Sequence, residues 1–347
     1  MPATIDIHAH FVSRELIAEA ERNGARYGLQ LDRDTKGSER IVFADGTRLR
    51  PFFSELCDLS VRLPTLQSLS IDRQLISTWT DMAGDLLAVP EAARWARLQN
   101  ETLADAAAQH PHIFEAMGTL PLQDVGASIE ELQHIVHNLG MRSIELSANL
   151  NGRDLDHPEY YPLWKRIRDL DVFVLLHPGF VTVSPPRLGR YFLNNLIGFP
   201  TDTTIAAACL IFSGIMQELP GLKCCLAHGG GFLPYQIGRL DRGFDAHPAC
   251  SGFLSVPPSE LMRAFYFDTL THGDDALRFL FETVDRRKIV YGSDYPFEML
   301  DETGPERVLR LSGVSEPEII AALGGNAEWA LGSSTARASN LQPTAGR

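Results

Sequence analysis

Hydrophobic positions along the chain fall into short runs that are separated by longer stretches of helical character. The runs are rich in Val, Ile, Leu or Phe and lack a clean alternation of apolar and polar residues. That pattern is typical of parallel strands that are buried on both faces. Eight strands are predicted, at residues 4–8, 73–78, 114–119, 143–146, 172–177, 222–227, 264–268 and 289–291.

Helices are predicted between these strands. The clearest one starts at Thr201-Asp202-Thr203-Thr204, which precedes an apolar run, and ends at Leu219-Pro220-Gly221. Eight strands that alternate with helices predict a (β/α)8 barrel, the TIM-barrel fold. An open doubly wound sheet is less favoured, because no G-x-G-x-x-G follows the first strand. The predicted helices are residues 90–110, 125–138, 158–170, 201–218, 274–283 and 316–330.

Two segments are too long for simple connections between a strand and a helix. Residues 11–70, after the first strand, are expected to form an inserted excursion beside the barrel mouth. Residues 180–200 form a second long loop after the fifth strand. We expect residues 1–331 to be a single barrel domain, and the Ser-, Thr-, Ala- and Gly-rich residues 332–347 to be a disordered tail.

Composition narrows the class of protein. The 347 residues include 31 Lys and Arg against 44 Asp and Glu, a net charge of −13, with no basic cluster. Such a chain is a poor binder of nucleic acid or anionic membranes. There is no run of about 18 apolar residues and no signal-peptide pattern at the N-terminus, so we expect neither a transmembrane helix nor a leader. Five cysteines without C-x-x-C indicate reduced thiols in the cytoplasm.

The first candidate for chemistry is His8-Ala9-His10 at the end of the first strand. Side chains two residues apart in a strand point the same way, so both imidazoles can reach one point. Neutral imidazoles suit zinc and similar metals. Two incidental histidines near the terminus are an equally simple explanation of this motif taken alone.

Further polar residues end other predicted strands. His177 ends the fifth strand, His228 follows the sixth, and Asp294 follows the eighth within Gly292-Ser293-Asp294-Tyr295-Pro296. The carboxyl ends of barrel strands carry the active site in essentially all enzymes of this fold. A single histidine at such a place is usually a core residue, but this coincidence at four strand ends favours a functional site.

Other motifs are excluded or assigned to packing. Gly229-Gly230-Gly231 allows the backbone to approach a ligand closely, but no Lys-Ser or Lys-Thr follows it, so it is not a P-loop. The chain contains no G-x-S-x-G, so a serine-hydrolase elbow is absent. Cys224 and Cys225 lie within a predicted strand and are interpreted as packing residues.

Together, His8-x-His10, His177-Pro178, His228-Gly229-Gly230-Gly231 and Gly292–Pro296 resemble the amidohydrolase superfamily. More narrowly, they resemble the branch of aminocarboxymuconate-semialdehyde decarboxylase and related non-oxidative decarboxylases. The resemblance covers about residues 4–331. It implies a (β/α)8 barrel with one divalent metal, zinc in most members and manganese in some.

The resemblance also implies roles for single residues. His8, His10, His177 and Asp294 would hold the metal, and His228 would be the catalytic acid and base. Arg50, in Leu49-Arg50-Pro51, would bind a substrate carboxylate, and Arg239, in Gly238-Arg239-Leu240, would reach the site of a neighbouring subunit. Residues 143–147 carry no lysine to bridge a second metal, and the loop at 187–191 lacks the tryptophan expected of the muconate-semialdehyde enzyme. The ordinary alternatives are a solvated side chain for Arg50 and a surface ion pair with Asp241 or Asp245 for Arg239.

The implied activity is a carboxy-lyase reaction on a small aromatic or muconate-type carboxylate with an ortho hydroxy or amino group. Two routes fit the residues. His228 can promote addition of water to an activated C=C before CO2 leaves, or Asp294, assisted by His228, can protonate a ring carbon. A metal-dependent hydrolase or hydratase is the alternative, and a non-catalytic metal-binding scaffold is less favoured. The Arg239 resemblance implies a homodimer or larger homo-oligomer.

Overall fold

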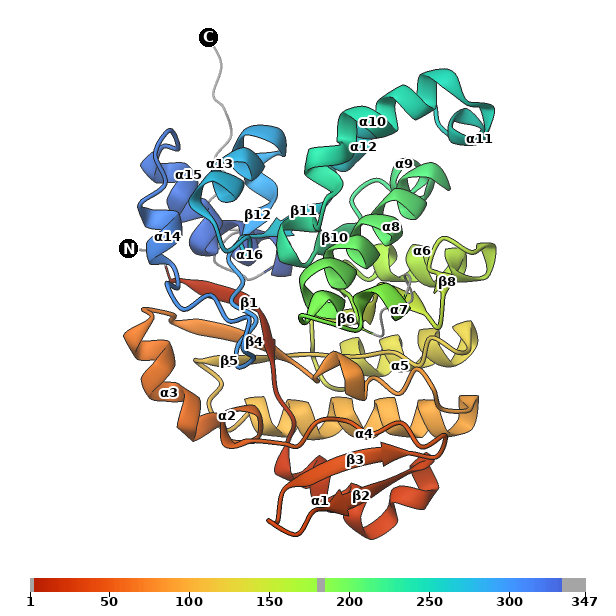
Figure 1. Cartoon of the computed structure of the whole chain (residues 1–347), viewed down its shortest axis with the longest axis vertical. Coiled ribbons are helices and arrows are strands. Elements are labelled where there is room, and N and C mark those ends of the chain that lie inside the picture. The colour runs from red at the N-terminus through yellow and green to blue at the C-terminus, as the bar shows by residue number, and fades with distance from the viewer. Residues whose placement is uncertain (1–2, 180–184, 333–347) are drawn as a thin grey trace.

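The protein is described by a computed structural model that covers residues 3–179 and 185–332. Its parallel strands lie at the centre and helices surround them (Figure 1). The predicted (β/α)8 barrel is confirmed, and each predicted strand is present. The tail predicted over residues 332–347 lies outside the described residues except for Gly332. The barrel strands are β1 (Ile5–His10), β4 (Arg73–Ser77), β5 (Phe114–Met117), β6 (Ser143–Ser147), β9 (Phe173–His177), β10 (Lys223–Leu226), β11 (Tyr266–Asp268) and β12 (Ile289–Val290).

The strands close into a ring through a few contacts beyond the regular ladders. One sheet has the order β1-β4-β5 and the other β6-β9-β10-β11-β12, and every pairing in both is parallel. A parallel bridge between Gly118 and Ile144 joins β5 to β6, and one between Ala9 and Tyr295 joins β1 to the segment after β12. The closed ring brings the carboxyl ends of all eight strands to one mouth.

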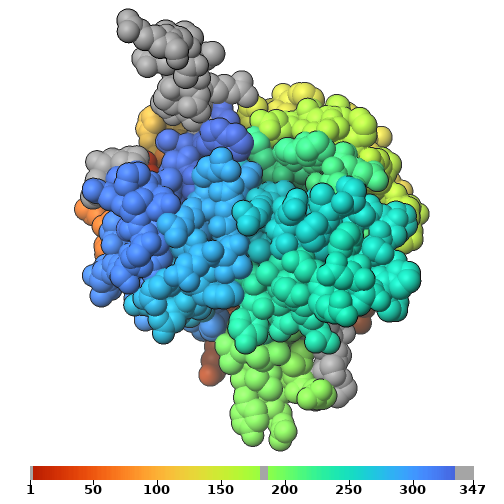
Figure 2. All heavy atoms as spheres, turned by 90° about the horizontal axis from the view of Figure 1, so that it is seen from above, coloured from red at the N-terminus to blue at the C-terminus, as the bar shows by residue number. Residues whose placement is uncertain are grey.

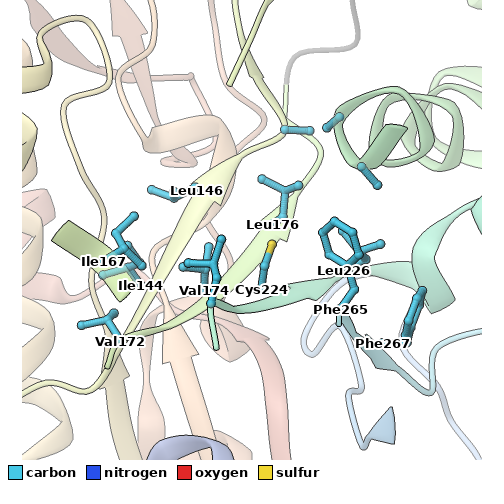
Figure 3. Packing of buried hydrophobic residues seen from close by; sticks show 14 of the residues in the cluster. Ile144, Leu146, Ile167, Val172, Val174, Leu176, Cys224, Leu226, Phe265 and Phe267 are labelled. Carbon is cyan, nitrogen blue, oxygen red and sulfur yellow. The ribbon is translucent and has the colours of Figure 1, made fainter. Parts of the chain in front are cut away.

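Alternate residues of each strand are buried on opposite faces. In β9, Val174 and Leu176 pack outward against the helices, in the cluster shown in Figure 3, while Phe173 and Leu175 belong to the cluster inside the barrel. Burial on both faces explains why the strands are apolar runs without alternation. The covering helices are α3 (Leu59–Ser68), α4 (Val89–Ala107), α5 (Val125–His137), α6 (Tyr161–Asp169), α8 (Phe199–Phe212), α10 (Leu233–Ala246), α13 (Asp274–Thr283) and α15 (Glu316–Ile320).

Helix α16 (Asn326–Leu331) closes the amino end of the barrel. Its Glu328 lies beside Arg73 of β4, and its Trp329 lies under the ammonium groups of Lys223 and Lys288. Arg73 and Lys223 stand on strands from opposite sides of the ring, and Lys288 directly precedes β12, so the helix spans the bottom. The mouth at the other end is therefore where a ligand can enter.

The predicted helix over residues 201–218 begins earlier than expected. A π-helical segment (Asn194–Gly198) leads directly into α8, and the hydroxyls of Thr201 and Thr204 donate to the carbonyls of Ile197 and Pro200 instead of capping a helix start. By length and composition alone, residues 194–212 are apolar enough to cross a membrane, contrary to our expectation for the chain. In the structure, α8 buries Ala206, Ala207, Leu210 and Ile211 in the barrel core.

Residues 11–58 form an excursion with a core of their own. It contains α1 (Arg14–Asn23), the antiparallel hairpin β2 (Leu29–Arg33) and β3 (Glu39–Phe43), and α2 (Ser54–Cys57). Its apolar side chains, among them Leu29 and Ile41, pack with Trp79, Met82 and Trp95 at the edge of the barrel. The following helix α3 packs in the barrel core. The excursion thus stands beside the mouth on α4 (Figure 1).

The remaining elements are short. The part of the chain around residues 185–200 includes α7 (Pro185–Leu188) and projects from the body of the molecule (Figure 2). The exposed side chains of Tyr191, Phe192 and Leu196 lie on this segment. The other short elements are α9 (Ile215–Glu218), α11 (Pro248–Ser251), α12 (Pro258–Met262), α14 (Glu306–Leu309), β7 (Asn149–Leu150) and β8 (Arg153–Asp154).

Candidate metal centre and active site

Four side chains from three strand ends converge at the mouth of the barrel. His8 and His10 come from β1, His177 is the last residue of β9, and Asp294 follows β12. All four are buried, and one potential ligand atom from each lies within 4.8 Å of the others. The structure therefore brings together the whole set that the sequence suggested for a metal.

A local irregularity in β1 aims both of its histidines inward. The register of β1 against β4 shifts between Asp6 and Ala9, which indicates a bulge. Ile5 and Ile7 lie in the cluster inside the barrel, yet His8 and His10 also face the centre, with ring centroids 5.3 Å apart. A bulge re-aims side chains in this way and is frequent beside active sites.

The free nitrogens of the three ligand histidines test whether a metal fits. Nε2 of His8, Nε2 of His10 and Nε2 of His177 are buried and have no hydrogen-bond partner among the described residues. Such atoms are costly to bury unless something binds them. Three imidazole lone pairs and a carboxylate form a donor set that zinc and other divalent ions accept. The residues present fit one divalent cation.

The opposite ring nitrogens are all engaged, so the orientation of each imidazole is fixed. Nδ1 of His8 lies 2.8 Å from the carboxylate of Asp268, and Nδ1 of His177 lies 2.9 Å from the hydroxyl of Thr80. Nδ1 of His10 lies 3.2 Å from the hydroxyl of Ser77. Hydrogen bonds of this kind set which nitrogen presents its lone pair to a metal.

Charges around the centre shift the pKa values of its members. Burial lowers the pKa of His177, and the nearby rings of His8 and His10 lower it further. Burial, the largest single effect, lowers the pKa of His8, but the hydrogen bond to Asp268 and the charges of the nearby carboxylates together outweigh it and raise this pKa to about 9. Burial raises the pKa of Asp294, yet contacts with neighbouring histidines hold it well below its ordinary range. Asp294 is therefore ionised and available as an anionic ligand.

His228 lies beside this set rather than within it. It follows β10, and its Nε2 is 3.8 Å from Oδ2 of Asp294. Its backbone N–H donates to Asp268, and its φ of +57° is a left-handed value that residues other than glycine rarely adopt. Asp294 has a similar φ of +60°. Strained backbone of this kind persists where the surroundings hold it and clusters at functional sites.

The glycines after His228 serve packing within the protein. A Cβ on Gly231 would lie 2.1 Å from the carbonyl oxygen of Pro200, at the start of α8, and one on Gly230 would lie 2.7 Å from Phe267. Gly231 also has a φ of +62°. Protein atoms therefore fill the space where a Cβ would stand at these two positions, although Gly229 and Gly231 also line a cavity beside His228.

Two cavities meet at Asp294. The larger, about 700 Å³, is lined mainly by apolar side chains such as Phe232 and Leu280 and is bounded by His228. The smaller, about 210 Å³, contains Arg50 and Asp81. A cleft with an apolar wall and a few convergent polar groups is the usual form of a small-molecule site.

Arg50 stands in the smaller cavity, as its predicted role requires. The segment that carries it runs along β3, where Leu49 N–H donates to Ile41. The guanidinium lies 4.4 Å from the ring centroid of Phe297 and forms two hydrogen bonds with Glu298, of 2.8 and 3.0 Å. The side chain of Arg50 is nevertheless 36% exposed, so an ordinary, partly solvated ion pair is still an alternative to substrate binding. Its ability to grip a carboxylate is visible in the pair with Glu298.

Arg239 does not reach the site of its own chain. It is exposed on α10, which extends away from the barrel (Figure 1), and it lines neither cavity. No ion pair with Asp241 or Asp245 forms within residues 3–179 and 185–332. Tyr235, one helical turn earlier, lines the larger cavity, so this face of α10 borders the mouth.

Several residues of the site were missed from the sequence. Asp268 ends the seventh predicted strand, and the rule that singled out His177 would have found it. No local sequence pattern marks the other three, Ser77, Thr80 and Glu145. They meet through hydrogen bonds between segments 65 or more residues apart.

A family model described as amidohydrolase matches residues 5–332, which is nearly the whole described chain. The chain belongs to the amidohydrolase family. This amidohydrolase is also 32% identical over 329 residues to 2-amino-3-carboxymuconate-6-semialdehyde decarboxylase of Dictyostelium discoideum, covering 94% of this chain and 91% of that one. The predicted resemblance to this branch of the family is confirmed.

Solved structures support the fold of the amidohydrolase. A 5-carboxyvanillate decarboxylase from Sphingomonas paucimobilis superposes with a TM-score of 0.81 at 21% identity, covering 95% of this chain and 99% of that one. A dihydroxybenzoic acid decarboxylase from Polaromonas sp. JS666, solved with bound manganese, has a TM-score of 0.75 at 22% identity, covering 96% and 97%.

Proposed function

We propose that the protein is a metal-dependent non-oxidative decarboxylase, a carbon–carbon lyase. Its substrate is a small aromatic or muconate-type carboxylate with an ortho hydroxy or amino group. The observation that carries the proposal is the position of His228, which adjoins the metal ligands but is not one of them. Decarboxylases among the relatives support it further.

The bound cation supplies positive charge that draws electrons from the reacting centre. Zinc is our first choice, because three imidazoles and a carboxylate suit it, and manganese is the second, because the Polaromonas enzyme binds it. His8, His10, His177 and Asp294 would hold the ion. The orphaned Nε2 atoms support this assignment.

The chain's own groups provide the proton chemistry. When CO2 departs, the carbon that keeps the electron pair must receive a proton. His228 and Asp294 both border the larger cavity, and Nε2 of His228 lies 3.8 Å from Oδ2 of Asp294. His228 thus serves as acid and base, and Asp294, which is ionised in the resting protein, is the second group that could deliver a proton to a ring carbon, once it has taken one up.

Arg50 binds a carboxylate of the substrate. In the substrate-free protein, Glu298 holds the guanidinium of Arg50. When the substrate binds, its carboxylate replaces that of Glu298 on Arg50. The aromatic wall formed by Phe297 and Trp79 keeps the guanidinium in place during the exchange. Arg50 and the metal ligands thereby hold two ends of a small acid.

We further propose a homodimer in which Arg239 reaches the partner's active site. Its exposure on α10, and the cavity bordered by Tyr235 on the same helix face, support the proposal. The cytoplasm is the proposed location, which the five free thiols support.

The test is metal analysis of purified protein followed by CO2 detection over a panel of ortho-hydroxy and ortho-amino carboxylates. We expect one divalent ion per chain, loss of activity with a chelator, and loss of metal in His177→Ala. Consumption of a substrate by water addition without CO2 release would support a hydratase instead. A loaded protein inert on every acid would support the scaffold alternative.

A further inference from the structure

Glu145 is a buried carboxylate that stands behind two of the three ligand histidines. It lies in β6, in the middle of Ser143–Ser147, and is 5% exposed. Each of its oxygens accepts one hydroxyl hydrogen bond, Oε2 from Ser77 at 2.6 Å and Oε1 from Thr80 at 2.7 Å. The same two hydroxyl oxygens contact Nδ1 of His10 and Nδ1 of His177.

The direction of these hydrogen bonds follows from the number of protons. A carboxylate can only accept, so the single hydroxyl hydrogen of Thr80 points to Glu145. The oxygen of Thr80 must then accept from Nδ1–H of His177. This ring consequently has no proton on Nε2, the atom that faces the other ligands. The Ser77 hydroxyl gives His10 the same tautomer.

We propose that Glu145 is a positioning residue that fixes the tautomer of two ligand histidines through Ser77 and Thr80, and so sets the affinity of the centre for its metal. The third ligand, His8, is oriented separately by Asp268. This role rests on the proposed metal centre but requires no turnover.

The two relays differ in one respect that makes the proposal testable. The hydroxyl of Ser77 has a second acceptor, the carbonyl oxygen of Ala9 at 3.2 Å. No other hydrogen-bond acceptor for the Thr80 hydroxyl is found within the described part of the chain besides Glu145 and His177. Without an acceptor at position 145, Thr80 would turn its hydrogen toward Nδ1 of His177, and Ser77 would turn toward Ala9.

Glutamine and methionine at position 145 therefore have different consequences. In Glu145→Gln, the amide oxygen can accept from Thr80 while the amide NH2 donates to Ser77, which itself donates to Ala9. Both histidines keep their tautomers. In Glu145→Met, Thr80 donates to His177, and the proton of that ring moves to Nε2. Only the second change blocks a ligand atom.

The experiment measures zinc affinity by competition with a chelating dye, and ring tautomers by 15N NMR of the metal-free protein at a pH where the rings are neutral. We expect Glu145→Met to lose about 10- to 100-fold in affinity, the range for a lost partner of a ligand histidine, with the His177 proton on Nε2 and His10 unchanged. Glu145→Gln should lose clearly less zinc affinity than Glu145→Met. Thr80→Val removes the hydroxyl oxygen that accepts from Nδ1–H of His177, so it should also lose zinc affinity, and the His177 proton should no longer be held on Nδ1.

The matched control is Asp85→Asn, which neutralises another buried carboxylate that accepts from a hydroxyl, that of Ser147 at 2.8 Å. It should leave zinc affinity unchanged. Equal losses in the Gln and Met variants would show that Glu145 acts by charge alone, and an unchanged His177 tautomer in Glu145→Met would also overturn the proposal. If Glu145→Met fails to fold, Thr80→Val decides by the same two measurements. If the native protein binds zinc but releases no CO2 from any acid, while the variants lose affinity as expected, the proposed function is contradicted and this inference stands.

Discussion

His228 and His10 contact different oxygens of the same carboxylate. Nε2 of His10 lies 3.2 Å from Oδ1 of Asp294, whereas Nε2 of His228 lies 3.8 Å from Oδ2. Asp294 thus faces the proposed ligands on one side and the proposed acid and base on the other. The two histidines therefore interact with Asp294 through separate oxygens.

We expect His228→Ala to retain its metal and to lose turnover by roughly 10²- to 10⁴-fold, as for a missing general acid and base. Metal content and the rate of CO2 release are the measurements. His272→Ala is the matched control, since His272 lines the same cavity and also has a positive φ, of +56°. Loss of metal in His228→Ala would make His228 a ligand.

Glu298→Gln should lower KM for a carboxylate substrate and leave kcat unchanged. The side chain of Glu298 is 71% exposed, and its pKa is lowered mainly by the hydrogen bond from Arg50, so the ionised form competes for this guanidinium. An exposed pair contributes about 0–1 kcal/mol, which limits the fall in KM to roughly fivefold. KM and kcat are measured by steady-state kinetics for Glu298→Gln and for the control Glu302→Gln, which changes another exposed glutamate. A KM that does not fall, or a rise shared by both variants, would argue against carboxylate binding at Arg50.

Arg239→Ala should cripple turnover while the barrel stays folded, if Arg239 acts across a dimer interface. A mixture of inactive Arg239→Ala and inactive His228→Ala chains should then regain activity, because each mixed dimer has one site with both residues intact. Random exchange at equal amounts restores about a quarter of the sites. A mixture that stays inactive despite demonstrated exchange, or a fully active monomer, would remove Arg239 from the mechanism.

Asp85→Asn should change the pH dependence of stability. Burial raises the pKa of Asp85 to about 6, against about 3.9 in an unfolded chain. Between these values the native state holds a proton that the unfolded state lacks. The stability contributed by this group is therefore present below pH 4 and is lost as the pH rises through 6.

An asparagine at position 85 does not titrate, so the free energy of unfolding of the variant, relative to that of the native protein, should rise by about 2 kcal/mol between pH 4 and pH 7. Urea unfolding of the metal-free protein at both pH values measures the difference. A constant difference between the two proteins would mean that Asp85 titrates normally.

The barrel was predictable because the hydrophobic pattern of each strand shows directly whether one or both of its faces are buried. Phe173 to Leu176 are apolar without alternation since both faces of β9 are covered, and His177 then marks the strand end. The start of α8 was not predictable. Thr201 to Thr204 have the composition of a cap, but their hydroxyls bond within a helix that already began at Asn194.

The proposed metal ligands were predictable from the sequence, but the residues that hydrogen-bond to them were not. His8, His10, His177 and Asp294 each stand at a strand end, and the barrel topology brings such ends together. Glu145 is inside a strand and contacts Ser77 and Thr80 only because the ring brings β4 and β6, on either side of β5, close together. The spacing of these residues along the sequence does not predict that contact.

The excursion over residues 11–58 has its own apolar core, and it delivers Arg50 to a centre whose other members are fixed by the barrel. If Arg50 binds the acid as we propose, recognition of the acid and the chemistry performed on it reside in separately stabilised parts of one chain. In evolution, such a division permits the hairpin to be lengthened, shortened or exchanged, so that a new acid is selected while the strand-borne centre is inherited intact.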